Sequence, residues 1–447
     1  MNIKIELPEE VKLIFSKLKE NGFEGYAVGG CIRDIILKRE INDWDITTNA
    51  KPEDVIAIFD KTIPTGIKHG TITVMINQKA YEVTTYRIDG EYLDGRHPEE
   101  VQFVDNLKED LNRRDFTINA LAYNEEDGIK DYFEGIEDLK NGIIRAVGDP
   151  KKRFEEDALR MMRCIRFASQ LNYKIEDDTL EGVKSLKSNL RKVSVERIRE
   201  EFNKIILADP KYVYNLLELG LLEIFIPELV ECKDVDQRNK HHIFNVLDHI
   251  IKSTENIEAK LYLRLTMLFH DIAKPRCMTI DDKGVGHFYG HDKESSIMAF
   301  NILKRLKYDN ETIEKVVALI KYHDTPVNKS KTIRKVLNRI GEDRFYDLLK
   351  VKAADLSAQS PVYHKEGYEK LEVIKLKFSE IQKNKDCFKL SDLKINGKDL
   401  IAIGITDGRN IGMVLNRLLA KVIEEPKLNE REILINRAKE YQKRILK

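Results

Sequence analysis

Apolar residues recur along this chain with two different periods, and the change between them predicts how it is organised. Up to about Val147, helical spacing in PEEVKLIFSKLKEN and RDIILK is mixed with strand-like segments, namely GYAVGG, DWDITT, GTITVMI, KAYEVTTYR and VQFV. This mixture predicts a small mixed sheet with helices packed on it. From Pro150 onward the strand pattern nearly disappears, and segments such as EEDALRMMRCIRFASQL and SVERIREEFNKIIL carry apolar residues at helical spacing.

The predicted fold class is therefore α+β, with a small N-terminal mixed β-sheet head followed by an all-α remainder. Neither an internal repeat nor a low-complexity linker interrupts the chain. We expect a head at residues 1–148, a helical neck at 149–232, a body at 233–378 and a tail at 379–447.

Composition narrows the class of protein without indicating an activity. A chain of 447 residues exceeds what one hydrophobic core organises, so we expect about two to four compact units. The formal net charge is zero, from 76 basic and 76 acidic residues, so any nucleic-acid site must be local. The five cysteines form no CxxC pair, which fits a reducing compartment. Neither a signal-peptide pattern nor an uncharged stretch of about 18 residues is present, which predicts a cytoplasmic location and no membrane partner.

The segment GYAVGGCIRDIILKREINDWDITT is the most informative stretch of the chain. A strand is predicted to stop at Gly29 and Gly30, where the backbone can approach a ligand closely, and a helix is predicted to open at Arg33 and Asp34. Amides at a helix N-terminus favour an anion such as a triphosphate. The guanidinium of Arg33 could fork onto its phosphate oxygens.

Asp43 and Asp45 flank a single residue, and in a strand this spacing places both carboxylates on one face. Paired hard oxygen ligands suit Mg²⁺, which leaves its other positions for water and phosphates. Taken alone, DxD is also consistent with a solvated strand end, and GG with an ordinary turn.

Together, these elements resemble the GG, RD and DxD signature of the class II tRNA nucleotidyltransferase and bacterial poly(A) polymerase family, within the polymerase-β-like superfamily. The resemblance implies that Asp43 and Asp45 are the catalytic residues and hold Mg²⁺, with Gly30 and Arg33 at the nucleotide. A third carboxylate often completes such sites. Glu82 in AYEVTTYR lies on a predicted strand at a plausible position, although a cross-strand partner on the surface is an equal alternative.

The run EDLNRRDFTINALAYN looks like the second motif of this family, which implies that Arg114 contacts the incoming nucleotide. An Arg–Asp pair capping a helix that begins near Thr117 is the alternative. The segment YLDGRHPEEVQFV, which contains the turn residues Asp94 and Gly95, resembles a flexible loop that CC-adding members have shortened. Its presence disfavours an enzyme that adds only CC.

The segment EEDALRMMRCIRF resembles the nucleotide-selecting motif of the family. Asp157, Arg160 and Arg163 recur at every third position, so we expect them on one face of a continuous helix. A carboxylate beside a guanidinium presents acceptors and donors that fit the edges of cytosine and adenine but leave uracil and guanine with unpaired groups. Arg166 has turned away from that face and is expected to meet phosphate or RNA. Plain intrahelical salt bridges are the alternative for all of them.

Eight of the ten histidines fall between residues 241 and 364. Their pattern resembles the HD phosphohydrolase superfamily, which implies that His249, His270, Asp271 and Asp355 bind a divalent metal. His291 and His323 would then be available for a second ion or a phosphate. Mixed imidazole and carboxylate ligands suit Mn²⁺, Ni²⁺, Fe²⁺ or Zn²⁺, which can activate water towards a phosphate ester. The alternative is a degenerate HD scaffold that supports RNA without metal.

The C-terminal GKDL, GI and IGxxL elements also resemble the family and imply that the tail holds the body of tRNA. The resemblance thus predicts an enzyme that adds CMP, CMP and AMP to tRNA 3′ ends from CTP and ATP, with Mg²⁺ and without a nucleic-acid template. The alternatives are a poly(A) or A-adding polymerase, an HD phosphohydrolase with an RNA-binding N-terminal portion, and an RNA-binding scaffold with two decayed sites. The sequence leaves the oligomeric state open.

Overall fold

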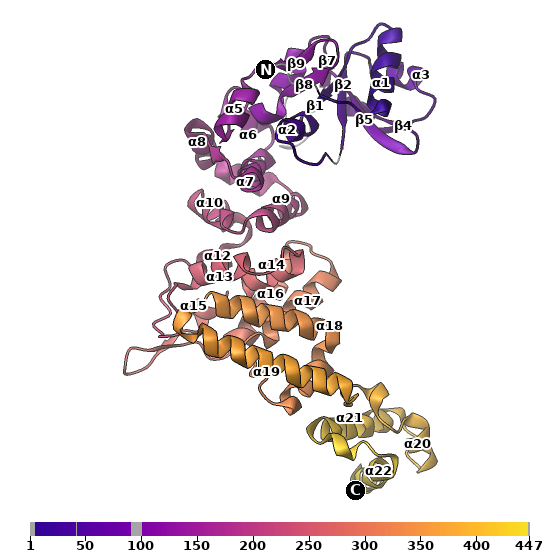
Figure 1. Cartoon of the computed structure of the whole chain (residues 1–447), viewed down its shortest axis with the longest axis vertical. Helices are drawn as coiled ribbons and strands as arrows, with labels where there is room; N and C mark the ends of the chain where they lie inside the picture. Colours follow the sequence, from indigo (N-terminus) through magenta and orange to yellow (C-terminus); the bar gives the residue numbers. More distant parts are fainter. Residues whose placement is uncertain (1–4, 42, 91–100, 446–447) are drawn as a thin grey trace. The chain divides into compact units, whose positions relative to one another are not determined.

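The computed structural model describes residues 5–41, 43–90 and 101–445, and the chain path is shown in Figure 1. The contacts divide the chain into two compact units, Met1–Pro227 and Glu228–Lys447. Most of the segment predicted to be a flexible loop, including Asp94 and Gly95, lies outside the described residues.

The first unit is built on a seven-stranded sheet with the order β3-β4-β5-β2-β1-β8-β9. Strands β2 and β5 run parallel, and the other neighbouring strands of this sheet run antiparallel. The predicted α+β class with an N-terminal mixed sheet is confirmed. The strands are β1 (Gly25–Val28), β2 (Asp45–Thr48), β3 (Thr62–Gly66), β4 (Thr71–Ile76), β5 (Lys79–Thr85), β8 (Leu121–Asn124) and β9 (Gly128–Asp131). Shorter pairs are formed by β6 (Arg87–Asp89) with β7 (Val101–Phe103) and by β10 (Ile143–Ile144) with β11 (Lys174–Ile175).

Strand β1 lies in the middle of the sheet and is buried on both faces. Ala27 belongs to one apolar cluster, whereas Tyr26 and Val28 belong to another. This explains why GYAV is apolar at successive positions, since alternation is expected only where one face meets water. The strand therefore forms a rigid base for the two glycines that follow it.

Helices surround this sheet and continue into the neck, as Figure 1 shows. Helix α1 buries Val11, Ile14 and Leu18, whose spacing gives the helix an apolar face. The helices of this part are α1 (Glu9–Glu20), α2 (Gly30–Ile36), α3 (Pro52–Ile58), α4 (Leu107–Asn112), α5 (Gly135–Asn141), α6 (Pro150–Glu156), α7 (Leu159–Leu171), α8 (Asp177–Leu186), α9 (Val195–Ala208), α10 (Tyr212–Glu218) and α11 (Leu222–Phe225). Helix α12 (Pro227–Val230) crosses the boundary between the two units.

Two sequence-based predictions about helices in this unit are wrong in detail. The helix predicted to open at Arg33 begins at Gly30, because Gly29 takes a left-handed φ of 83° and turns the chain before it. The continuous helix predicted across Asp157 is broken there into α6 and α7, and Asp157 has extended backbone angles. Its side-chain Oδ1 instead accepts from the amide of Leu159 at 3.0 Å, which caps the start of α7.

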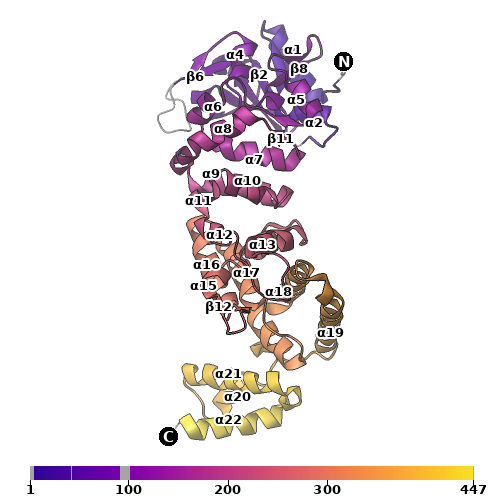
Figure 2. The same cartoon turned by 90° about the vertical axis from the view of Figure 1, so that its left-hand side faces the viewer.

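The second unit is almost entirely helical, and its tail helices α20 to α22 pack on one another (Figure 2). The elements are α13 (Val246–Glu255), α14 (Leu261–Phe269), α15 (Lys274–Cys277), β12 (Thr279–Ile280), β13 (Gly286–His287), α16 (His291–Arg305), α17 (Asn310–Tyr322), α18 (Ser330–Ser357), α19 (His364–Lys383), α20 (Gly397–Ala402), α21 (Gly408–Glu424) and α22 (Arg431–Ile445). Across the described ranges, we find no helix that is both long and apolar enough to cross a bilayer.

Helix α18 contacts the tail helix α21 before its kink and supplies a residue of the histidine cluster after it. It is kinked at Gly341, where φ is 81° and ψ is 173°, a combination that only glycine adopts readily. Before the kink, Arg334 Nε donates to the carbonyl of Ile423 on α21 at 2.9 Å. After the kink, the helix carries Asp355 towards the histidine cluster.

Candidate functional site

The paired aspartates of the head lie at the start of the parallel strand pair β2–β5. Asp45 is the first residue of β2, and the backbone register places Glu82 of β5 directly beside it. Asp43 precedes the strand by two residues, and both aspartates are exposed. The parallel pairing thus brings together three carboxylates from two segments.

Negative charge is concentrated at this strand end. Partial desolvation raises the pKa of Asp45; Arg114 opposes this effect, and the like charge of Asp43 adds to it. Partial desolvation also raises the pKa of Glu82, with Asp45 and Asp43 as further causes. Over the described residues, groups of three or more potential ligand atoms within 4.8 Å of one another occur only in the second unit, so these three carboxylates are spaced more widely. An exposed acidic set of hard oxygen donors fits a divalent cation such as Mg²⁺.

Arg114 lies against the glycine turn that follows β1. A Cβ atom on Gly29 would come within 3.0 Å of its Nη1, so the absent side chain makes room for the guanidinium. Arg114 also pairs with the fully buried Asp110, with Nη2 3.8 Å from Oδ2, and its buried Nε lacks a hydrogen-bond partner. The predicted nucleotide contact therefore lies beside Gly29 and within the electrostatic influence of Asp45.

Arg33 is held by two side chains rather than being free. Its Nε and Nη2 donate to the two oxygens of Asp34 at 3.0 and 2.8 Å, and its Nη1 donates to Asn119 Oδ1 at 2.7 Å. Gly30 lies beside it, since a Cβ atom there would meet Arg33 Nη2 at 3.6 Å. The two predicted triphosphate-binding residues are thus brought together.

Asp157 and Arg160 are not hydrogen-bonded to each other through their side chains, because the helix break gives them different partners. Asp157 Oδ2 accepts from Arg197 Nη2 of α9 at 2.8 Å. Arg160 donates to Glu156 at 2.7 Å and to the carbonyl of Arg113 at 2.9 Å. The latter bond ties the segment predicted to select the base to the arginine stretch that contains Arg114.

Arg163 and Arg166 both lie over the ring of Phe167 but pair with different acids. Arg163 Nε donates to Asp115 Oδ2 at 2.7 Å, whereas Arg166 pairs with Glu201 of α9. Asp157 and Arg166 thus pair with residues one turn apart on α9, Arg197 and Glu201, and the predicted contact of Arg166 with phosphate or RNA stays a prediction.

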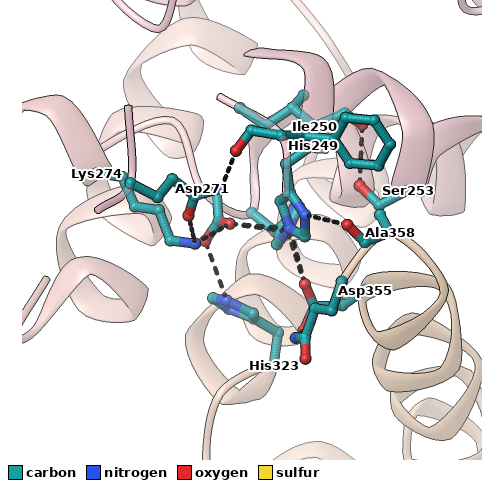
Figure 3. A network of polar contacts seen from close by, with 12 residues as sticks. His249, Ile250, Ser253, Asp271, Lys274, His323, Asp355 and Ala358 are labelled. Carbon is teal, nitrogen blue, oxygen red and sulfur yellow. Dashed lines mark hydrogen bonds and ion pairs between the residues drawn. The ribbon is translucent and has the colours of Figure 1, made fainter. Parts of the chain in front are cut away.

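The histidine cluster of the second unit brings together residues from five separate segments. Helix α13 carries His249, the end of α14 is followed by His270 and Asp271, and α18 carries Asp355. The atoms His249 Nε2 and Asp355 Oδ1 lie 2.9 Å apart, and the Nε2 atoms of His249 and His270 lie 3.2 Å from Asp271 Oδ2. Figure 3 shows His249, Asp271 and Asp355 pointing toward one another.

A second group shares one residue with the first. His291 at the start of α16 and His323 at the end of α17 place their Nε2 atoms 3.2 and 3.6 Å from Asp271 Oδ1. The potential ligand atoms thus form two sets, His249, His270, Asp271 and Asp355 on one side and Asp271, His291 and His323 on the other. Asp271 is common to both sets and offers a different oxygen to each.

The four imidazole rings share one orientation, with Nδ1 towards a backbone carbonyl and Nε2 towards Asp271. Each Nδ1 lies within hydrogen-bond distance of a backbone carbonyl, those of Ala358, Met267, Phe288 and Ile320. When Nδ1 carries the proton in a neutral ring, Nε2 presents a lone pair. Backbone carbonyls behind Nδ1 are the usual support for metal-binding histidines.

The centre of the cluster is strongly charged. Burial alone would raise the pKa of Asp271, but His270 and Lys274 outweigh it and hold that pKa well below its usual range. Lys274 Nζ lies 2.6 Å from Asp271 Oδ2, yet neither oxygen of Asp271 makes a hydrogen bond of good geometry. A buried carboxylate whose two oxygens both face imidazole Nε2 atoms fits a bound cation.

Sequence reasoning missed several residues that support these sites. Lys274 follows Asp271 by one helical turn, which is a signal that was available in the printed sequence. No local pattern distinguished Asn119, Phe167 or Lys352, because each has at least one partner far away along the chain, namely Arg33 for Asn119 and Phe167 and the carbonyl of Thr325 for Lys352.

Three segments of the chain match known protein families. Residues 25–145 match the family described as poly A polymerase head domain, residues 172–232 the probable RNA and SrmB-binding site of polymerase A, and residues 294–438 a tRNA nucleotidyltransferase domain 2. The CCA-adding enzyme of Ligilactobacillus salivarius is 34% identical over 97% of each chain.

Solved structures cover the chain equally well. The CCA-adding enzyme of Bacillus stearothermophilus in complex with CTP is 29% identical, with a TM-score of 0.71 and coverage of 98% of each chain. The Thermotoga maritima CCA-adding enzyme complexed with tRNA has a TM-score of 0.60 at 21% identity, covers 97% of this chain and 95% of its own, and shares the fold.

Proposed function

This chain belongs to the family of CCA-adding enzymes, and from that premise we propose how its residues add CMP, CMP and AMP to the 3′ end of tRNA. The protein is a nucleotidyltransferase whose partners are tRNA, CTP and ATP. In each step, the tRNA 3′-hydroxyl attacks the α-phosphorus of the nucleotide. The new bond joins the 3′-oxygen to phosphorus, the bond to the β-phosphate oxygen breaks, and pyrophosphate leaves.

Asp43 and Asp45 would hold the Mg²⁺ ions that the family implies, and Glu82 would complete the acidic set. When bound, Mg²⁺ makes the attacking hydroxyl more acidic and neutralises charge on the leaving pyrophosphate. The observation that carries this assignment is the parallel register of Asp45 with Glu82 beside Asp43. The carboxylates of this acidic strand end would repel a triphosphate unless a cation lay between them.

Arginines beside the glycine turn would bind the nucleotide. Arg33 and Gly30 would receive the triphosphate, and Arg114 would contact the nucleotide near Asp45. Asp157 and Arg160 would read the base, with Arg163 beside them, and Arg166 would support this face through Glu201. These fixed acceptors and donors would pair with cytosine or adenine, whereas uracil and guanine would leave buried groups unpaired. The protein side chains would thus select the base in place of a nucleic-acid template.

The decisive experiment uses tRNA that lacks its CCA end. We expect incorporation of CMP with CTP alone and completion of CCA with CTP and ATP, and Asp43→Ala should abolish both while tRNA binding persists. Asp60→Asn is the matched control, since the Asp60 side chain is fully exposed in the head. Full activity of Asp43→Ala would refute the metal assignment.

The same assay separates the nearest alternative. A poly(A) or A-adding polymerase would share the acidic site but would incorporate AMP and no CMP. Sequencing of the 3′ ends made from one tRNA with all four nucleotides would therefore identify the product directly.

We also propose that the second unit holds a metal-dependent phosphohydrolase centre of the HD type. The observation that favours it is the shared use of Asp271 by two sets of ligand atoms, with every Nε2 directed inward. One set would use His249, His270, Asp271 and Asp355, and the other would add His291 and His323. Mn²⁺, Ni²⁺, Fe²⁺ or Zn²⁺ suits these donors and would activate water towards a phosphate ester.

Separate variants test the two activities independently. Phosphate release should survive loss of Asp43 and Asp45 and disappear in His270→Ala or Asp271→Asn. CCA addition should show the reverse pattern. Retention of phosphohydrolysis in Asp271→Asn would rule out this centre as its source.

A further inference from the structure

Three arginines gather around one aromatic ring in the first unit. The guanidinium carbons of Arg33, Arg163 and Arg166 lie 5.0, 5.4 and 3.9 Å from the centroid of the Phe167 ring. Phe116 packs edge-on against this ring, with centroids 5.7 Å apart, and Phe167 is only 4% exposed. Cations within about 6 Å of an aromatic face are attracted to it.

Each of these guanidiniums has its own carboxylate, which offsets their mutual repulsion. Arg33 pairs with Asp34, Arg163 with Asp115 of the arginine stretch, and Arg166 with Glu201. Burial alone would raise the pKa of Asp115, but Arg163 and Asn119 outweigh this and hold that pKa well below its usual range. The acid that anchors Arg163 is therefore ionised throughout the neutral range.

Asn119 connects two of these pairs. Its Oδ1 accepts from Arg33 Nη1 at 2.7 Å, and its Nδ2 donates to Asp115 Oδ1 at 3.0 Å. Asp115 Oδ2 in turn accepts from Arg163 Nε at 2.7 Å. A side-chain amide can accept from the guanidinium through its oxygen and donate to the carboxylate through its nitrogen, and it adds no charge.

We propose that Asn119 and Phe167 are positioning residues that hold Arg33 and Arg163 in a fixed relation, so that triphosphate binding and nucleotide selection are mechanically coupled. The proposal rests on the roles given above to Arg33 and Arg163. The coupling runs from α2 of the head through the 3-10 helix Thr117–Asn119 to α7 of the neck. All of these elements belong to the first unit.

Asn119→Leu tests this coupling, because it keeps the side-chain size and removes both hydrogen bonds. We expect the KM for CTP and for ATP to rise about tenfold or more with a smaller fall in kcat, since a hydrogen bond to a charged group is worth at least that factor. Asn119→Asp should act similarly, because it retains an acceptor for Arg33 but repels Asp115. Asn141→Leu is the control, since Asn141 is exposed and bonds only locally to Glu137.

Product inhibition distinguishes coupling from a merely structural role. Pyrophosphate reports the Arg33 side and CMP reports the Arg163 side, so the inhibition constants of both should rise in Asn119→Leu protein that circular dichroism shows to be folded. Phe167→Leu should weaken both ligands in the same way. The double variant Asp115→Asn with Asn119→Asp should bind both ligands more tightly than Asn119→Asp alone, since the carboxylate and the amide exchange positions.

Two results would overturn the proposal. Folded Asn119→Leu protein with unchanged KM for both nucleotides would show that Asn119 does not position them. A loss of pyrophosphate inhibition alone would show that Asn119 serves Arg33 without coupling. An unmodified protein that incorporates no CMP would instead refute the proposed function, which keeps the two failures distinct.

Discussion

His249 and His270 face each other through their Nε2 atoms at a distance of 3.2 Å, while their Nδ1 atoms lie against the carbonyls of Ala358 and Met267. Two neutral imidazoles in this tautomer present lone pairs to each other and cannot form a hydrogen bond. A proton or a metal ion must lie between them. The same arrangement recurs between His291 and His323 at 3.3 Å.

We therefore expect purified protein to bind close to two transition-metal ions per chain, and His270→Ala to lose about one of them, since His270 belongs to one of the two sets. The measurement is elemental analysis after dialysis against each of the candidate metals. His69→Ala, which alters a histidine of the first unit, should bind as much metal as the parent. An unmodified protein without stoichiometric metal would identify the cluster as a scaffold.

Lys352 connects the helix that carries Asp355 to the segment that carries His323. Its loss should reduce metal binding at the set of Asp271, His291 and His323. This lysine lies on α18 one turn before Asp355. It donates to the carbonyl of His323 and, at 2.9 Å, to the carbonyl of Thr325. Lys352→Met should release the end of α17 and reduce bound metal from about two ions to about one. Lys350→Met on the same helix removes only contacts to Glu258 and Asp347 and should leave the metal content unchanged. Equal metal content in both variants would exclude a positioning role for Lys352.

The two glycines after β1 should respond differently to alanine. Gly29 has a φ of 83°, and an added Cβ would meet Arg114 Nη1 at 3.0 Å, so Gly29→Ala should lower the melting temperature. Gly30→Ala meets only Arg33 Nη2 at an ordinary 3.6 Å and should fold normally. If Gly30 approaches the triphosphate, its variant should nevertheless raise the KM for both nucleotides, as steady-state kinetics would show. A normal KM would remove Gly30 from the site.

Asp115 should make the first unit sensitive to acid. Its pKa in the folded protein lies below the ordinary value of 3.8, so its contribution to stability is complete above that value and is lost as the pH falls. Asp115→Asn should cost about 3 kcal/mol near pH 7, because Arg163 loses its buried partner. The difference between parent and variant should shrink below about pH 4. Denaturant unfolding at several pH values measures it, and a difference independent of pH would contradict the assignment.

Much of the organisation followed from local patterns. The periodicities predicted the mixed sheet, the change to helices after Pro150 and most element types, because burial of one face imposes a period on each element. Asp43, Asp45, His270 and Asp271 could be predicted as site residues from the sequence, since each belongs to a short motif whose chemistry depends on adjacent positions.

Other features depended on packing between distant segments. Asp45 meets Glu82 only because β2 and β5 pair in parallel, and Arg33 meets Asn119 across 86 positions of the chain. The helix expected to run through Asp157 breaks there, because that carboxylate caps α7 and pairs with Arg197. Local sequence cannot show which competing partner a side chain will take.

By itself, then, the sequence determined which residue types could perform the chemistry and in which segments they lie, because motifs and periodicity are local properties. The tertiary structure alone decided that Asp271 serves two sets of ligands and that Asn119 joins Arg33 to Asp115. Such contacts arise from the burial of several elements at once, and no single stretch of sequence encodes them.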